Sequence, residues 1–197
     1  MLRTGTLTTT RWINALRATL GEAKADLSDL GLERLRHRLS QLAWRADCPS
    51  VASVTPSSIH IEGYARHLLA SGAAGGHEAL LIAWPPNHQT PLHDHAGLWG
   101  IELVLDGALS VSEYRVDRTA ARTALTPQRS LVLGIGDAAA FSGRDCAHTC
   151  RNLSANRAAL SLHVYGGALE RYSIFSINEA GDCRTTETHA RIDTLSV

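Results

Sequence analysis

The stretch HDHAGLWGIELVLDGALSVSEYRV, residues 93–116, contains the pattern that decides the fold. Two short apolar runs, Gly100–Leu105 and Leu109–Val116, stand on either side of the pair Asp106-Gly107. An Asp-Gly pair between two apolar runs is a strong signal for a β-hairpin. We therefore expect two strands here, joined by a tight turn and paired with each other.

Other short apolar runs surround this stretch and are separated from it by turn residues. They are Ala79–Trp84, Ser130–Leu133, Ala158–Tyr165 and Arg171–Ile177, with Pro85-Pro86-Asn87, Gly134, Gly136 and Gly166-Gly167 among the residues between them. Many short strands with turn signals between them are typical of an antiparallel sandwich or barrel. The sequence therefore predicts a mainly β domain.

The first fifty residues have a different pattern, because their apolar residues recur at helical spacing. One stripe contains Trp12, Leu16 and Leu20, and a second contains Leu27, Leu30, Leu35, Leu39 and Leu42. Pro49 and the Ser/Thr/Pro-rich residues up to Ser58 form a boundary. We expect residues 1–58 to be a helical segment that packs on a β domain of residues 59–197, the two forming one structural unit.

Composition excludes several classes of function. Lys+Arg and Asp+Glu number 19 each, so the formal net charge is zero, and we expect neither a nucleic-acid nor a membrane partner. No apolar run approaches the ~20 residues of a membrane span, and the N-terminus lacks the apolar core of a secretory signal. We therefore expect a cytoplasmic protein whose four cysteines are free thiols.

Two histidine clusters indicate a metal site. In an extended segment alternate residues share a face, so His93 and His95 point the same way and Asp94 points the opposite way. His148 follows three or four expected strands later, which is enough for a barrel to bring it beside the first pair. Neutral imidazole is a good ligand for iron, zinc, copper or nickel.

A third cluster lies in the run Ala158–Tyr165. Strand alternation places Ser161, His163 and Tyr165 on one face, where three polar groups are costly unless they bond to each other or to a site. A hydrogen-bond relay from Ser161 through His163 to Tyr165 gives each of the three polar groups a partner. The short link from Asn152 to Ala158 predicts a hairpin that sets this strand beside the His148 strand.

Together the three clusters resemble the thiol dioxygenases, the cysteine dioxygenase family within the cupins. His93, His95 and Gly107 fit the first cupin motif, G-x5-HxH-x(3,4)-E-x6-G, while Asn87 stands in place of its first glycine and Gly100 in place of its glutamate. Loss of that carboxylate marks the thiol dioxygenases. His148 and Asn152 match the second cupin motif, and Ser161, His163 and Tyr165 match the relay of the family.

The resemblance implies a cupin antiparallel β-barrel of the jelly-roll type that binds Fe(II) through His93, His95 and His148. It implies an enzyme that adds both atoms of O₂ to the sulfur of a small thiol to give a sulfinic acid. The segment Tyr64–Leu68 resembles the family segment whose arginine binds the substrate carboxylate, so Arg66 is expected to bind substrate. Tyr165, the last member of the relay, is expected to bind substrate as well. Gly100 implies that the cysteine–tyrosine crosslink of animal enzymes is missing.

Several alternatives stay open. Cysteine, 3-mercaptopropionate and mercaptosuccinate are all candidate thiols, and Arg171 is a possible second cation for a dicarboxylate. A non-catalytic metal-binding cupin, serving as a sensor or a store, is the alternative function. A zinc site of Cys146, His148 and Cys150 is a further possibility. The protein is expected to be a monomer or a homodimer.

Overall fold

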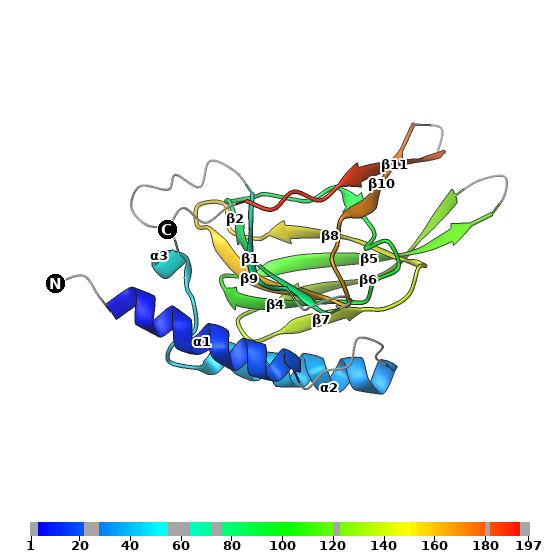
Figure 1. Ribbon diagram of the computed structural model, residues 1–197. Helices are drawn as coiled ribbons and strands as arrows, with labels where there is room; N and C mark the ends of the chain where they lie inside the picture. Colours follow the sequence, from blue (N-terminus) through cyan, green and yellow to red (C-terminus); the bar gives the residue numbers. More distant parts are fainter. Residues whose placement is uncertain are drawn as a thin grey trace.

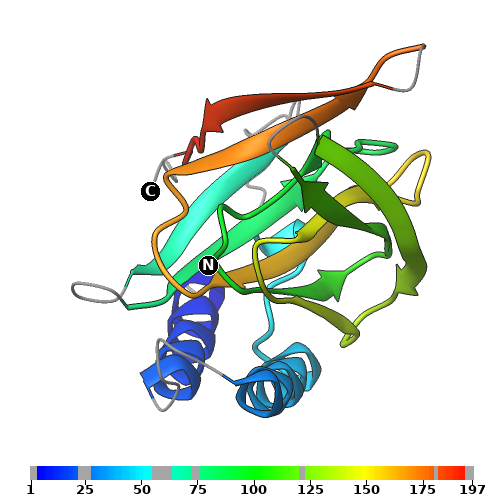
Figure 2. The ribbon, with the colours of Figure 1, turned by 90° about the vertical axis from the view of Figure 1, so that its right-hand side faces the viewer.

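Two antiparallel β-sheets face each other in this protein, and a layer of helices covers the outer face of one of them (Figures 1 and 2). The computed structural model describes residues 4–21, 28–54, 64–71, 76–119, 123–179 and 182–193. The arrangement is the mainly β, antiparallel two-sheet fold with N-terminal helices that the sequence predicts.

The first sheet has five strands in the order β1-β2-β9-β4-β7. Their bounds are Ala65–Ser71 (β1), Glu78–Trp84 (β2), Ala159–Tyr165 (β9), Gly100–Asp106 (β4) and Ala138–Phe141 (β7). Strand β9 lies at its centre and pairs antiparallel with β2 on one side and β4 on the other.

The second sheet has six strands in the order β11-β10-β3-β8-β5-β6. Their bounds are Cys183–His189 (β11), Arg171–Ile177 (β10), Leu92–His93 (β3), Cys146–Asn152 (β8), Leu109–Arg118 (β5) and Thr123–Leu133 (β6). The two-residue strand β3 is held between β8 and β10, which places the first histidine cluster in the middle of the sheet.

Strands β2 and β9 are buried along their whole length because the first sheet is covered on both faces. Leu160, Leu162 and Val164 of β9 belong to the core that the helices share with the sheet. Ser161, His163 and Tyr165 alternate with them and therefore face the interior between the sheets. The two-residue period of the sequence thus separates packing residues from residues of the site.

The helices are α1 (Thr4–Gly21), α2 (Asp29–Ser40), the 3₁₀ turn η1 (Gln41–Trp44) and α3 (Val51–Val54). Trp12, Leu16 and Leu20 of the first predicted stripe are buried in this layer, and Trp12 Nε1 donates to the carbonyl of Leu42 at 2.9 Å.

The second predicted stripe is confirmed for its later members, Leu35, Leu39 and Leu42, which are buried. Its first member, Leu27, lies outside the described residues. Leu30 is 61% exposed and Leu32 takes the buried position, because Leu32 shares one face of α2 with Leu35 and Leu39, whereas Leu30, two residues earlier, lies on the opposite face.

Two predicted pairings are wrong. The Asp106-Gly107 turn forms, with Gly107 at φ +84°, but it carries the chain from β4 in the first sheet to β5 in the second. The link after Asn152 likewise joins β8 to β9 in the opposite sheet. From β2 to β5 and from β6 to β10, consecutive strands alternate between the two facing sheets, so both of these short links cross the barrel and do not form hairpins.

The helical layer and the first sheet share one hydrophobic core, formed by residues of α1 and α2 with residues of β2, β4 and β9. The predicted boundary after residue 58 lies outside the described residues, so the division into 1–58 and 59–197 stays a prediction. Among the described residues, no helix is both long enough and apolar enough to cross a membrane.

Candidate metal centre

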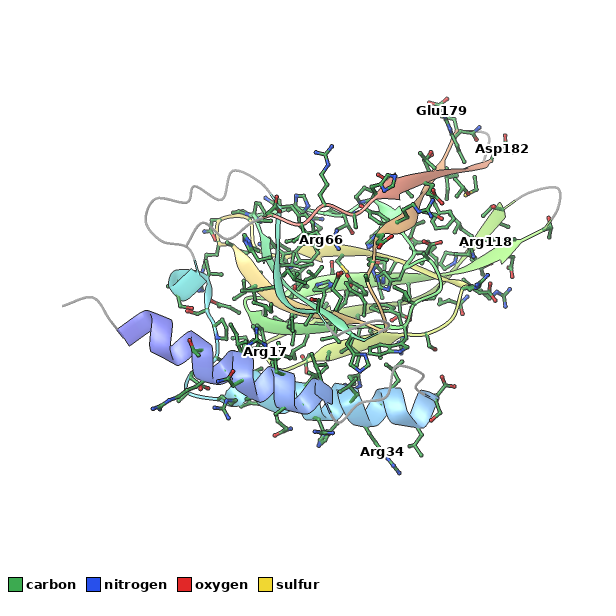
Figure 3. The ribbon with its side chains drawn as sticks, in the orientation of Figure 1. Arg17, Arg34, Arg66, Arg118, Glu179 and Asp182 are labelled. Carbon is green, nitrogen blue, oxygen red and sulfur yellow. The ribbon has the colours of Figure 1, made fainter. Side chains whose placement is uncertain are left out.

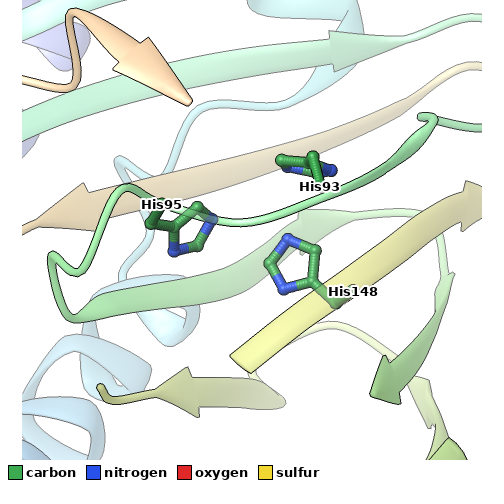
Figure 4. Close-up of side chains that lie close together, drawn as sticks. All are labelled: His93, His95 and His148. Carbon is green, nitrogen blue, oxygen red and sulfur yellow. The ribbon is translucent and has the colours of Figure 1, made fainter. Parts of the chain in front are cut away.

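His93, His95 and His148 converge inside the barrel, as Figure 4 shows. His93 of β3 is the register partner of His148 of β8, and His95 follows two residues after His93. The ring centroids lie 4.6 Å apart for His93 and His148, 4.8 Å for His95 and His148, and 5.8 Å for His93 and His95. One nitrogen of each ring lies within 4.8 Å of the others. The three histidines therefore form a candidate metal site.

Contacts around the rings fix their orientation. His93 Nδ1 lies 2.9 Å from the carbonyl oxygen of Pro91, which leaves Nε2 as the coordinating nitrogen. Phe141 packs against His148 with ring centroids 4.1 Å apart. Among the described residues, the buried Nε2 atoms of His95 and His148 have no hydrogen-bond partner. A buried imidazole nitrogen without a partner is costly, and a bound metal ion satisfies it.

The protonation state of the cluster also suits a metal. Burial lowers the pKa of His93 to about 3, and the neighbouring His148 acts in the same direction. Burial also holds the pKa of His95 well below its usual range, with His148 and His93 as the next causes. These two imidazoles are therefore neutral near pH 7, which is the form that coordinates a cation.

Asp94 points away from the histidines and ties the HxH segment to two neighbouring elements. Its carboxylate accepts from the backbone N–H of Ser173 at 2.8 Å and pairs with Arg118 at 2.6 Å. Between these anchors the backbone of residues 93–95 is held on β10 and the end of β5. The predicted division of faces is confirmed, because Asp94 is structural while its two neighbours face the interior.

The predicted relay of Ser161, His163 and Tyr165 has the required contacts. Ser161 Oγ lies 2.9 Å from His163 Nε2, and the Tyr165 hydroxyl lies 3.3 Å from His163 Nδ1. Trp84 Nε1 also donates to Ser161 Oγ at 2.7 Å. The relay lies on β9, across the barrel from His148, and the rings of Tyr165 and His95 are 4.9 Å apart.

Arg66 lines a cavity of about 200 Å³ that reaches His93 and Tyr165. Figure 3 places Arg66 within the strand framework, whereas Arg34 on α2 points away from the sheets. The Nη1 atom of Arg66 donates to the carbonyl of Arg191 at 3.2 Å. The other lining residues are Tyr64, His88, Thr90, Pro91, Leu169 and Tyr172. The structure therefore brings the predicted carboxylate-binding arginine, the relay tyrosine and one histidine of the cluster to a single cavity.

Sequence reasoning missed Glu102, which is 2% exposed and lies beside His148 and His163. Its Oε1 lies 3.2 Å from His148 Nε2 and 3.2 Å from His163 Nδ1, and its Oε2 accepts from the Cys150 thiol at 2.9 Å. Burial raises the pKa of Glu102, but the neighbouring His148 and His163 outweigh burial and hold that pKa well below its usual range. A lone charge in the apolar run Gly100–Leu105 was the available signal.

Among the described residues, Cys146 does not join a metal-binding cluster with His148 and Cys150. Cys150 instead groups with Glu102 and His148, and the four cysteines are free thiols as predicted. Arg171 is exposed, pairs with Glu187 on β11 at 3.3 Å, and is not among the residues that line the cavity.

Gly100 borders the cluster at the place where a side chain would collide with it. A Cβ atom there would lie 2.8 Å from His95 Nδ1 and 3.4 Å from the Tyr165 ring. The close approach of these two rings to the β4 backbone therefore requires glycine. Because residue 100 is glycine, this position also provides no thiol beside Tyr165.

One sequence family and several solved structures match this chain. The sequence pattern of the cysteine dioxygenase type I family matches residues 51–178. Among solved structures, a Thermus thermophilus protein is 22% identical, with 59% of this chain and 93% of that chain covered and a TM-score of 0.43. A cupin superfamily protein from Desulfitobacterium hafniense is 11% identical, with coverage of 58% and 84% and a TM-score of 0.41.

Proposed function

The chain belongs to the cysteine dioxygenase type I family, and we propose that it is an Fe(II)-dependent dioxygenase of small thiol carboxylates. The observation that carries the proposal is the convergence of His93, His95 and His148 beside a cavity lined by Arg66 and Tyr165. The reaction joins a thiol and O₂ to give a sulfinic acid, with both oxygen atoms transferred to sulfur.

The donor set fits ferrous iron, because neutral imidazoles with open positions beside them suit a redox-active divalent ion. When bound, ferrous iron supplies the electrons that let triplet dioxygen react with a closed-shell thiolate. The histidines hold the ion, and the cavity beside His93 admits the substrate.

Tyr165 serves as a hydrogen-bond donor toward the cavity. Burial, with the Glu102 carboxylate as the next cause, holds the pKa of its hydroxyl well above the usual range, so it keeps its proton. If Ser161 donates to His163 Nε2, then His163 Nδ1 carries a proton toward Glu102 and the Tyr165 oxygen. The Tyr165 hydroxyl hydrogen is then free to point at substrate or oxygen.

Arg66 binds the carboxylate of the substrate in this proposal. A guanidinium presents a planar fork of N–H donors that matches a carboxylate in two parallel hydrogen bonds. The carbonyl of Arg191 and the walls of the cavity hold that fork in place. The distance between Arg66 and the histidine cluster then sets the length of thiol that the site accepts.

An oxygen electrode tests the proposal on the iron-loaded protein with cysteine, 3-mercaptopropionate, mercaptosuccinate and cysteamine. We expect thiol-dependent oxygen uptake with formation of one sulfinate per O₂ by mass spectrometry. His93→Ala, His95→Ala and His148→Ala should each lose bound iron and activity. Iron bound at full occupancy with no turnover of any thiol would instead favour the non-catalytic metal-binding cupin.

A further inference from the structure

The segment Arg191–Asp193 follows β11 and runs from the edge of the second sheet to the edge of the first (Figure 1). Strands β11 and β1 are edge strands of opposite sheets, and residue 193 forms a parallel bridge with His67 on β1. Just before the segment, the backbone N–H of Ala190 donates to the carbonyl of Glu170 at 2.8 Å. The segment therefore ties the two sheet edges together, beside a cavity that residues of β1 and β10 line.

Two contacts attach this segment to the backbone of Arg66. The backbone N–H of Arg66 donates to Asp193 Oδ2 at 2.9 Å, and the backbone N–H of Asp193 donates to the Arg66 carbonyl at 2.7 Å. An edge strand presents a row of backbone groups that have no strand partner, and β1 is such a strand. Asp193 satisfies both of these groups at residue 66 and so holds the backbone from which the arginine side chain extends.

A third contact attaches the segment to the guanidinium of the same residue. Arg66 Nη1 donates to the carbonyl of Arg191 at 3.2 Å. A guanidinium has five N–H donors, so this one contact leaves donors for a substrate carboxylate. An arginine side chain loses much rotamer freedom when it is ordered. The Arg191 carbonyl therefore reduces the number of orientations of the fork before any substrate binds.

The segment lies beyond the part of the chain that matches the family. The match to the cysteine dioxygenase type I pattern ends at residue 178, and β11 begins only at Cys183. The family match by itself therefore does not account for the contacts between this segment and Arg66.

We propose that the segment Arg191–Asp193 is a positioning element of the substrate site, which holds the Arg66 guanidinium in the orientation that binds the carboxylate of the thiol. The inference rests on the proposed function for its class of substrate. The contacts of the segment reach β1 and the residue before β10, whereas His93 and His148 lie on β3 and β8. Loss of these contacts should therefore weaken carboxylate binding and leave metal binding intact.

Asp193→Pro tests the inference, because proline removes both the backbone N–H and the carboxylate that bind Arg66. Isothermal titration calorimetry on the iron-loaded, full-length protein in the absence of oxygen measures the affinity, with 3-mercaptopropionate and cysteamine as probes. We expect the Kd of 3-mercaptopropionate to rise about tenfold, because the guanidinium is still present but must be ordered on binding. The Kd of cysteamine should change by less than about twofold, and the iron content should equal that of the wild type.

Two aspartate variants serve as controls. Asp193→Asn keeps an oxygen acceptor and the backbone N–H, so its Kd for 3-mercaptopropionate should lie within about threefold of the wild-type value. Asp182→Asn removes the same charge from the turn between β10 and β11, which Figure 3 shows far from Arg66, and should leave both Kd values unchanged.

The double variant Arg66→Ala/Asp193→Pro shows whether the segment acts through Arg66. Arg66→Ala already removes the guanidinium, so the added Asp193→Pro should raise the Kd of 3-mercaptopropionate no further. A tenfold increase in both backgrounds would overturn the inference, as would a wild-type Kd in Asp193→Pro. Equal losses for 3-mercaptopropionate and cysteamine would also overturn it, because they would indicate a general loss of structure.

Oxygen uptake by the wild-type protein is measured separately, since it reports on the proposed function alone. Selective loss of 3-mercaptopropionate binding in Asp193→Pro, without thiol oxidation by the wild type, would retain the positioning element and reject the dioxygenase. Thiol oxidation with an unchanged Kd in Asp193→Pro would retain the dioxygenase and reject the positioning element. Wild-type protein that binds 3-mercaptopropionate no more tightly than Arg66→Ala does would likewise reject the positioning element.

Discussion

At the scale of single residues, the site separates charges that act on a substrate from charges that hold the fold. Arg66 and Arg171 were both candidate cations, and only Arg66 lines the cavity, because Arg171 pairs with Glu187 at the surface. Alternation along a strand predicted the faces of Ser161 and His163 correctly. It could not rank the two arginines, since both positions depend on pairing between strands distant in the sequence.

Arg66→Ala is expected to raise KM for 3-mercaptopropionate by about 100-fold, because a charge-assisted, forked pair contributes roughly 3 kcal/mol. Cysteamine lacks a carboxylate, so its KM should change by less than about threefold. Steady-state oxygen uptake measures both values. Arg171→Ala is the matched control and should leave both unchanged. Equal increases for the two thiols would mean that Arg66 does not bind the carboxylate.

Cys48 provides a prediction of pH dependence away from the metal centre. Burial raises the pKa of its thiol to about 11, with the carboxylates of Asp47 and Asp106 as further causes. Alkylation requires the thiolate, so iodoacetamide should modify native Cys48 roughly 100-fold more slowly at pH 8 than it modifies the unfolded chain. The rate should rise about tenfold per pH unit up to pH 11.

The raised pKa of the Cys48 thiol also makes the free energy of unfolding depend on pH. The unfolded chain ionises this thiol first, so Cys48 favours the folded state below about pH 9 and that contribution is lost between pH 9 and 11. Peptide mapping identifies the modified residue, and Cys48→Ser removes the signal. Native Cys48 that reacts at pH 8 as fast as an unfolded thiol would contradict the prediction.

At the scale of elements, short strands and their ends position the site. Strand β3 has two residues, yet it brings His93 beside His148 because β8 and β10 hold it from both sides. Asn152 ends β8 and closes the link that crosses to β9. Its Nδ2 lies within 3.2 Å of the carbonyls of Trp84, Pro85 and Arg157, and its Oδ1 accepts from Ser154 N at 3.0 Å.

Asn152→Ala should therefore lower the free energy of unfolding by about 2–3 kcal/mol, because it leaves buried carbonyls without a donor. Urea denaturation followed by circular dichroism measures the change. Asn156→Ala, in the exposed part of the same link, is the control and should cost less than about 0.5 kcal/mol. If both variants lost the same free energy of unfolding, the buried Asn152 amide would stabilise the fold no more than the exposed Asn156 amide.

At the scale of the whole molecule, the two sheets enclose a polar centre that the packing alone does not satisfy. His95 Nε2 and His148 Nε2 are buried without hydrogen-bond partners among the described residues, and Glu102 is a buried anion beside them. The core residues of the helical layer pack on the other face of the first sheet, away from this centre. A bound metal ion should therefore stabilise the fold.

Removal of the metal by a chelator is expected to lower Tm by about 5–10 °C when the metal had been present at about 100 times its Kd. Differential scanning calorimetry of the loaded and stripped protein measures the difference. Fe(II) added back should restore Tm in the wild type and leave the Tm of His148→Ala unchanged. The same Tm with and without metal would mean that no ion binds at the cluster.

The sequence by itself determined the elements and most of the donor set. Hydrophobic periodicity depends on neighbours in the chain, so it predicted the helical stripe of Trp12, the strands around Gly100 and the shared face of His93 and His95. Only the tertiary structure decided which strands pair, because alternation between facing sheets is a property of the barrel and not of the Asp106-Gly107 turn. It also decided the place of Glu102, whose reach to His148 depends on two sheets meeting across the interior.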